Sequence, residues 1–163
     1  MYRAGHAGVA MVAYAPLGVG VALEWEVSVA AVGLLAAVAL STLPDVDEAL
    51  SAVDHRGPTH SLPFAVLVGV FLAAVTAIAA GPIGLTPSGG LLAFAFVVGT
   101  LSIVSHLLAD VITPMGIRPF WPVSDRHYTL DLTPAANPTA NYLLLSVGVM
   151  TVMVATVVVT SLG

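Results

Sequence analysis

The chain has 163 residues, of which 58% are hydrophobic and only 8% charged, whereas a soluble domain carries about a quarter charged residues. No Lys, Arg, Asp or Glu occurs between Arg56 and Asp110 or from Leu132 to Gly163, which excludes a fully water-exposed fold. The net charge of −5, from nine acidic residues and four Arg with no Lys, offers no basic stripe, so no direct nucleic-acid partner is expected.

Five apolar segments approach the roughly 20 residues that a helix needs to cross a bilayer. They run from Ala4 to Leu23, Val27 to Leu43, Leu62 to Ala80, Leu91 to Ile112 and Tyr142 to Leu162. The fourth carries His106 and Asp110 in its last two turns, before Thr113-Pro114 ends it. The sequence thus predicts an all-α fold, an integral membrane helical bundle of about four to five transmembrane helices, with residues 1–163 in one domain.

The first apolar segment has two interpretations. Arg3 ahead of an apolar run is also the outline of a secretory signal peptide. However, the run contains His6 and Pro16, and no convincing small-x-small cleavage site precedes Glu24. We therefore expect a first helix that is retained.

The arginines predict the orientation in the membrane, since cytoplasmic loops carry an excess of Arg and Lys. With five spans, all four fall on the same side: Arg3, Arg56, Arg118 and Arg126. The opposite side carries Glu24 and Glu26 and a neutral Gly-Pro-Ser stretch. We expect a multi-pass protein of the cell membrane with its N-terminus in the cytoplasm and its C-terminus outside.

The same alternation brings ionisable residues together near the cytoplasmic face. Three His and three Asp fall at this end of the spans: His6, Asp45, Asp47, His60, His106 and Asp110. Because the chain has no Cys, a metal site has to be built from such His and carboxylate groups. This convergence is the strongest functional signal in the sequence.

The acidic motifs also have structural interpretations. His106 and Asp110 lie four apart on a predicted helix, with Cβ atoms about 6 Å apart, and suit either one shared ion, a packing hydrogen bond or a proton relay. Asp45-Val46-Asp47 can bridge a pair of cations, yet an acidic turn of this kind more often caps a helix or is solvated.

The segment His55-Arg56-Gly57-Pro58-Thr59-His60-Ser61 is denser in functional groups. It holds two imidazoles, a guanidinium and two hydroxyls around a Gly-Pro turn, which a plain interfacial loop rarely needs. Its structural interpretation is that Thr59 or Ser61 caps the following helix while Arg56 faces lipid phosphate.

These motifs resemble the membrane-bound metal-dependent hydrolases typified by the LexA-regulated inner-membrane protein YdjM. The resemblance rests on blocks between positions 5 and 122: Gly5-His6, Leu43-Pro44-Asp45-Val46-Asp47, the whole segment 55–61, Ser105-His106-Leu107-Leu108-Ala109-Asp110, Thr113-Pro114-Met115-Gly116 and Trp121-Pro122. Glu48 departs from the family pattern, in which His is common after the second Asp. A fainter similarity, in order and spacing, is to the metal clusters of zinc-dependent phospholipase C and related nucleases, with matches at His6, Asp47, His60, His106 and Asp110.

The resemblances imply a membrane-embedded metal-dependent hydrolase, with a metal-bound water as nucleophile and a phosphoester or lipid-linked substrate at the cytoplasmic interface. The expected cofactor is one or two divalent ions, with zinc as the first choice. The expected ligands are His6, Asp45 or Asp47, His60, His106 and Asp110. Asp45 is the expected general base, Arg56 the group that binds a phosphate or oxyanion, and His55 a proton donor or outer-shell partner.

Two other classes of function stay open at this point. A small proton- or metal-coupled transporter also places His and Asp in membrane helices, although its polar residues would extend through the full bilayer. A non-catalytic metal-binding membrane protein would use the same cluster without turnover. The lipid bilayer is an expected partner in every case, together with an unknown small or lipid-linked substrate if the protein is an enzyme.

Overall fold

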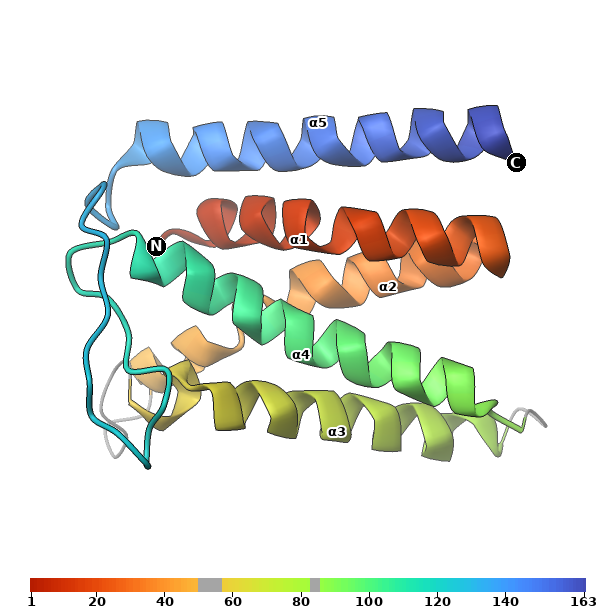
Figure 1. Cartoon of the computed structure of the whole chain (residues 1–163), viewed down its shortest axis with the longest axis horizontal. Helices are drawn as coiled ribbons and strands as arrows, with labels where there is room; N and C mark the ends of the chain where they lie inside the picture. The colour runs from red at the N-terminus through yellow and green to blue at the C-terminus, as the bar shows by residue number, and fades with distance from the viewer. Residues whose placement is uncertain (50–56, 83–85) are drawn as a thin grey trace.

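The computed structural model describes residues 1–49, 57–82 and 86–163. The regular structure within these ranges is helical (Figure 1): α1 (Arg3–Glu24), α2 (Val27–Leu40), α3 (Leu62–Ala80), α4 (Gly89–Val111) and α5 (Pro138–Leu162), with short 3-10 helices η1 (Pro44–Ala49) and η2 (Pro58–His60). Five segments are long and apolar enough to cross a membrane, the second of them running from Val27 to Asp47. The predicted all-α membrane bundle is therefore confirmed.

Polar caps determine where three of the long helices begin. The side-chain oxygens of Ser61, Ser88 and Asn137 accept hydrogen bonds from backbone N–H groups three residues further on, at 3.3, 3.1 and 3.2 Å. Such caps satisfy N–H groups that have no partner inside the helix. The Asn137-Pro138 pair starts α5 about one turn earlier than the predicted Tyr142, because Pro fits the first turn of a helix.

The second helix ends earlier than predicted. The expected span reached Leu43, whereas α2 ends at Leu40. Pro44 disfavours helical backbone in the residue before it, and the chain continues through a short turn into η1. This change of direction carries Asp45 away from the axis of α2.

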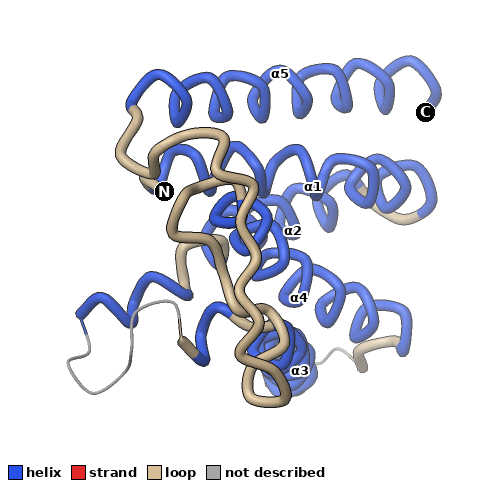
Figure 2. Tube along the Cα trace, turned by 60° about the vertical axis from the view of Figure 1, so that its left-hand side comes forward, coloured by secondary structure: helices blue, strands red, loops and turns tan. Residues whose placement is uncertain are grey.

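The helices pack around α1 and α4 (Figures 1 and 2). Helix α1 lies against α5, α2 and α4, and α4 lies against α3 as well as α1 and α2. Helix α4 has ten buried residues, whereas α5 buries only Asn141 and Gly148. Because the outer faces of a membrane bundle contact lipid, the exposed apolar residues of α3 and α5 need no protein partner.

Helices α1 and α5 approach one another closely through glycines. A Cβ atom added to Gly8 would lie 2.2 Å from the Leu144 carbonyl oxygen, and one added to Gly148 would lie 2.6 Å from the Gly8 carbonyl oxygen. Small residues let helix backbones meet in membranes, where packing rather than water exclusion drives association. The pair Gly8 and Gly148 therefore holds α1 against α5.

A leucine at Gly8 tests this contact. We expect Gly8→Leu to lower the stability of the detergent-solubilised protein by about 1–3 kcal/mol or more, because the backbones of α1 and α5 must separate. Gly20→Leu on the same helix is the matched control, since a Cβ at Gly20 meets nothing within 4 Å. Thermal melting followed by circular dichroism makes the comparison, and equal melting temperatures for the two variants would contradict the packing.

Candidate metal centre

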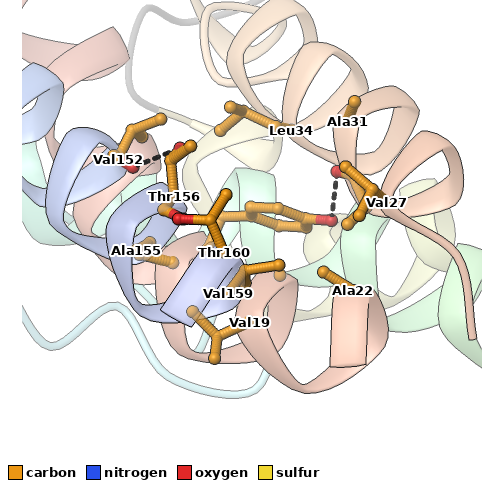
Figure 3. Close-up of a pocket in the computed structure, with 14 residues that line it drawn as sticks. Val19, Ala22, Val27, Ala31, Leu34, Val152, Ala155, Thr156, Val159 and Thr160 are labelled. Carbon is orange, nitrogen blue, oxygen red and sulfur yellow. Dashed lines mark hydrogen bonds between the residues drawn. The ribbon is translucent and has the colours of Figure 1, made fainter. Parts of the chain in front are cut away.

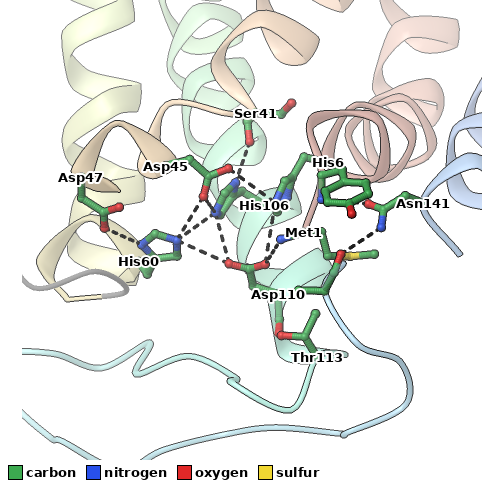
Figure 4. Close-up of polar contacts among 12 residues, drawn as sticks. Met1, His6, Ser41, Asp45, Asp47, His60, His106, Asp110, Thr113 and Asn141 are labelled. Atoms are coloured by element: carbon green, nitrogen blue, oxygen red, sulfur yellow. Dashed lines mark hydrogen bonds and ion pairs between the residues drawn. The ribbon is translucent and has the colours of Figure 1, made fainter. Parts of the chain in front are cut away.

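Buried polar side chains gather at one end of the bundle. The chain alternates direction, so the starts of α1 and α3 and the end of α4 lie at the same end (left in Figure 1). Five His and Asp side chains meet there, one from α1, one from η1, one from η2 and two from α4 (Figure 4): His6, Asp45, His60, His106 and Asp110. All except Asp45 are fully buried, and the Asp45 side chain is 21% exposed.

His60 and His106 face one another across the cluster. Their Nε2 atoms are 3.0 Å apart. The Asp110 Oδ2 atom lies 3.4 Å from each of these nitrogens. The Asp45 Oδ1 atom lies 3.5 Å from Nε2 of His106 and 3.7 Å from Nε2 of His60. Two imidazole nitrogens and two carboxylates thus point toward one small volume.

His6 completes the cluster from the opposite side. Its ring stacks on His106, with centroids 3.9 Å apart and planes 7° apart. Its Nε2 atom is 3.7 Å from one oxygen each of Asp45 and Asp110. Within the described part of the chain neither ring nitrogen of His6 has a hydrogen-bond partner. A buried polar atom without a partner costs free energy, so the ring is placed as a ligand would be.

The donor set fits a metal ion. One ligand atom from each of His6, Asp45, His106 and Asp110 can be chosen so that all four lie within 4.8 Å of one another. Imidazole and carboxylate groups together suit zinc and related divalent ions. The cluster could therefore hold a metal ion, and His60 lies beside it at the distances given above.

The backbone of Ser41 orients His106. The Nδ1 atom of His106 lies 2.7 Å from the Ser41 carbonyl oxygen, which can only accept a hydrogen bond. The Nδ1 atom must therefore carry a proton, and in the neutral ring Nε2 then presents its lone pair to the cluster. Histidines that bind metals are typically held in this way.

His60 lies outside the membrane-spanning helices, in η2, and its protonation is coupled to the carboxylates. Burial by itself lowers the pKa of His60, but contacts with Asp110 and Asp45 outweigh it and raise the pKa above its ordinary value. Since a metal binds the deprotonated nitrogen, an ion competes with a proton at this ring.

Hydrogen bonds at and near Asp110 connect several segments at this end of the bundle. The amino group of Met1 donates to Asp110 Oδ1 at 2.9 Å, and the Thr113 hydroxyl donates to the Asp110 carbonyl oxygen at 2.8 Å. Asn141, at the start of α5, accepts from the Tyr2 N–H at 2.9 Å. These contacts link the segment before His6 to the end of α4 and the start of α5.

The other predicted site residues lie in different places. Asp47 contacts the far nitrogen of the His60 ring, with its Oδ2 atom 3.2 Å from Nδ1. His55 and Arg56, the predicted proton donor and phosphate-binding group, lie outside the described residues. Ser41 and Asn141 were not among the site residues expected from the sequence. Ser41 acts through its carbonyl, which every residue type has, so no sequence signal could have indicated it.

An apolar hollow lies away from the cluster (Figure 3). It has a volume of about 200 Å³ and is lined by residues of α1, α2 and α5, among them Leu34, Val152 and Thr156. Tyr14 at its wall donates its hydroxyl to the Ala30 carbonyl at 2.7 Å. None of the cluster residues lines it. The hollow therefore has no titratable group for chemistry other than the Tyr14 hydroxyl, which is already bonded.

A comparison with family models matches residues 1–162 to the YdjM inner membrane protein family. The chain belongs to this family. The match to YdjM covers all five spans and every residue of the cluster. Neither the curated proteins nor the solved structures include a match to the chain.

Metal content is the direct test of the YdjM-family cluster. We expect protein purified in mild detergent without chelator to retain a divalent metal, and His106→Ala to lose it, because a central ligand is removed. His127→Ala is the matched control, since His127 contacts the Met115 carbonyl at 2.6 Å and lies outside the cluster. Mass spectrometry measures the metal, and equal content in the two variants would show that the cluster does not hold it.

Proposed function

We propose that this protein is an integral membrane metal-dependent hydrolase whose site cleaves a phosphoester, in a lipid or lipid-linked substrate, at the cytoplasmic face. The observation that carries the proposal is the group of buried His6, His106 and Asp110 with the partly exposed Asp45, whose ligand atoms converge at one end of the spans. In such a site a bound zinc ion would act as a Lewis acid and lower the pKa of a water molecule for attack at neutral pH.

The burial pattern supports distinct roles for the carboxylates. Asp110 is fully buried and lies near His6, His60 and His106, as a ligand enclosed by the protein does. Asp45 is the one member of the cluster with exposed surface, at 21%. Water and substrate reach the cluster most directly at this carboxylate, so we assign it the role of general base as well as ligand.

The remaining ligand and binding roles follow the sequence motifs. His60 is assigned to the ligand set because its Nε2 atom faces the cluster. With His60 included, the cluster has enough ligands for one or two ions. Arg56 is assigned to the substrate phosphate, which a guanidinium binds through two parallel hydrogen bonds. His55 is assigned to proton donation. The roles of Arg56 and His55 rest on the motif alone.

The distribution of buried charge favours a fixed site over a transport pathway. In the described ranges, the buried His and Asp side chains all lie at one end of the bundle, whereas a proton or ion pathway places such groups through the bilayer thickness. The lipid-linked substrate is inferred from this location, because a site at the end of membrane spans is reached from the plane of the lipid head groups.

Hydrolysis is tested with a lipid and a soluble phosphoester. We expect the zinc-loaded protein in mixed micelles to release inorganic phosphate from phosphatidic acid, and Asp45→Asn to slow release by roughly a hundredfold or more, because a general base is lost. Asp125→Asn, whose side chain is 81% exposed in a loop, is the matched control. Chelation should abolish release and zinc should restore it.

The results with the two substrates separate the parts of the proposal. Release from p-nitrophenyl phosphate alone would contradict the lipid substrate, whereas no metal-dependent release from either ester would contradict phosphoester hydrolysis.

The orientation belongs to the same proposal. Arg3, at the start of α1, and Arg118 and Arg126, in the loop after α4, lie at the same end as the cluster, whereas Glu24 and Glu26 lie at the other. This charge distribution supports an N-terminus and a site on the cytoplasmic side.

Because the chain has no Cys, single cysteines can report the orientation. We expect Val123→Cys, at a loop position that is 91% exposed, to be protected from a membrane-impermeant maleimide in intact cells and labelled after lysis. Thr86→Cys, exposed in the loop before α4, should be labelled in intact cells. The reverse pattern would place the site outside the cell.

A further inference from the structure

The ring of His60 is contacted at both of its nitrogens by residues of two different 3-10 turns. Its Nε2 atom faces the cluster, 3.7 Å from Asp45 Oδ1. Its Nδ1 atom lies 3.2 Å from Asp47 Oδ2 and 3.0 Å from the Thr59 hydroxyl oxygen. Asp47 and His60 are buried, so these polar contacts are shielded from bulk water (Figure 4).

The hydrogen-bonding capacity of these groups determines which atom donates. The Thr59 hydroxyl donates to Asp47 Oδ2 at 2.6 Å, which uses its single proton. The hydroxyl oxygen can then only accept from His60 Nδ1, and an ionised carboxylate can likewise only accept. Both partners therefore favour a proton on Nδ1, and in the neutral ring the Nε2 lone pair is left facing the cluster.

We propose that Asp47 and Thr59 are positioning residues that hold His60 in the orientation and tautomer needed to bind a metal ion through Nε2. The inference rests on the proposed metal site. It makes Asp47 a hydrogen-bond partner of the ligand His60 rather than a ligand itself. A carboxylate behind a metal-binding histidine fixes the ring and increases its basicity as a ligand.

The two central histidines are then arranged in the same way. The Ser41 carbonyl holds Nδ1 of His106, as Asp47 and Thr59 hold Nδ1 of His60. When both rings are neutral, their Nε2 atoms, 3.0 Å apart, present two lone pairs to each other. Two lone pairs at this distance repel unless a cation lies close to both. The orientation of both rings thus favours a shared positive ion at the cluster.

This geometry explains why the two Asp residues of the Asp-x-Asp motif are separated by one residue. Asp45 and Asp47 come from the same short turn, η1, and contact the two opposite nitrogens of one imidazole. On the other side, the Ser61 hydroxyl donates to the Pro58 carbonyl at 2.6 Å and closes the turn that carries Thr59 and His60. Two carboxylates separated by one residue can therefore hold one ring at both edges.

The test removes the supporting hydroxyl and the supporting charge separately. We expect Thr59→Val and Asp47→Asn each to weaken zinc binding by about 10–100-fold, the range typical of partners behind a metal ligand. Thr59→Ser should restore the affinity, because it keeps the hydroxyl. Thr76→Val is the matched control, since the Thr76 hydroxyl bonds the Leu72 carbonyl on α3, away from the cluster. A competition assay with a zinc-sensitive dye gives the affinities.

Cobalt-substituted protein gives a second readout, which a general loss of stability would not produce. We expect the visible absorption bands of bound Co²⁺ to shift in Thr59→Val and Asp47→Asn and to be unchanged in Thr59→Ser and Thr76→Val. Thermal melts of the metal-free proteins, matched to wild type, confirm that the variants are folded.

The outcomes distinguish this inference from the proposed function. If wild type binds zinc and both Thr59→Val and Asp47→Asn bind it within twofold, the positioning role is wrong while the metal site stands. If Asp47→Asn abolishes binding and Thr59→Val has no effect, Asp47 acts as a ligand and the inference is likewise wrong. If wild type itself binds no zinc or cobalt, the metal site fails and the inference fails with it.

Discussion

The pairing of buried imidazoles with buried carboxylates is the interaction on which the rest of this structure depends. An ionisable side chain inside a membrane bundle is costly unless it is paired, coordinated or placed next to water. Here His6, His106 and Asp110 are fully buried and lie within a few ångströms of one another. The ends of α1 and α4 must therefore stay in register, because sliding either helix by one turn would leave a charge without its partner.

Much of the fold follows from hydrophobic length alone. The spans expected from the sequence agree with the helices within a few residues, because a bilayer requires a nearly uniform apolar length and leaves few alternatives. The differences lie at Pro44 and at Asn137-Pro138, where local backbone chemistry rather than hydropathy decides the boundary. The packing of α1 against α5 was not predicted, since two glycines 140 positions apart carry no visible pairing signal.

The sequence was enough to predict which residues lie close together at the site. It was not enough to predict the contacts that each of them makes. Alternating spans bring His6, His60 and His106 to one end whatever the details of packing. The side of the His60 ring that Asp47 contacts depends on the paths of η1 and η2, which no spacing rule describes. The Ser41 contact is made by the backbone and leaves no trace in the residue type. The identity of the metal, the type of reaction and the choice of substrate all depend on such orientations of the side chains.

The contact between α1 and α5 also bears on how the protein is made. Helix α5 follows the other four helical spans along the chain, so Gly148, which packs against Gly8, enters the membrane after them. The start of α5 also provides Asn141, which binds the backbone just before α1. The packing of α1, which carries His6, against α5 is therefore completed only once α5 has entered the membrane, and a chain synthesised only as far as α4 lacks this support.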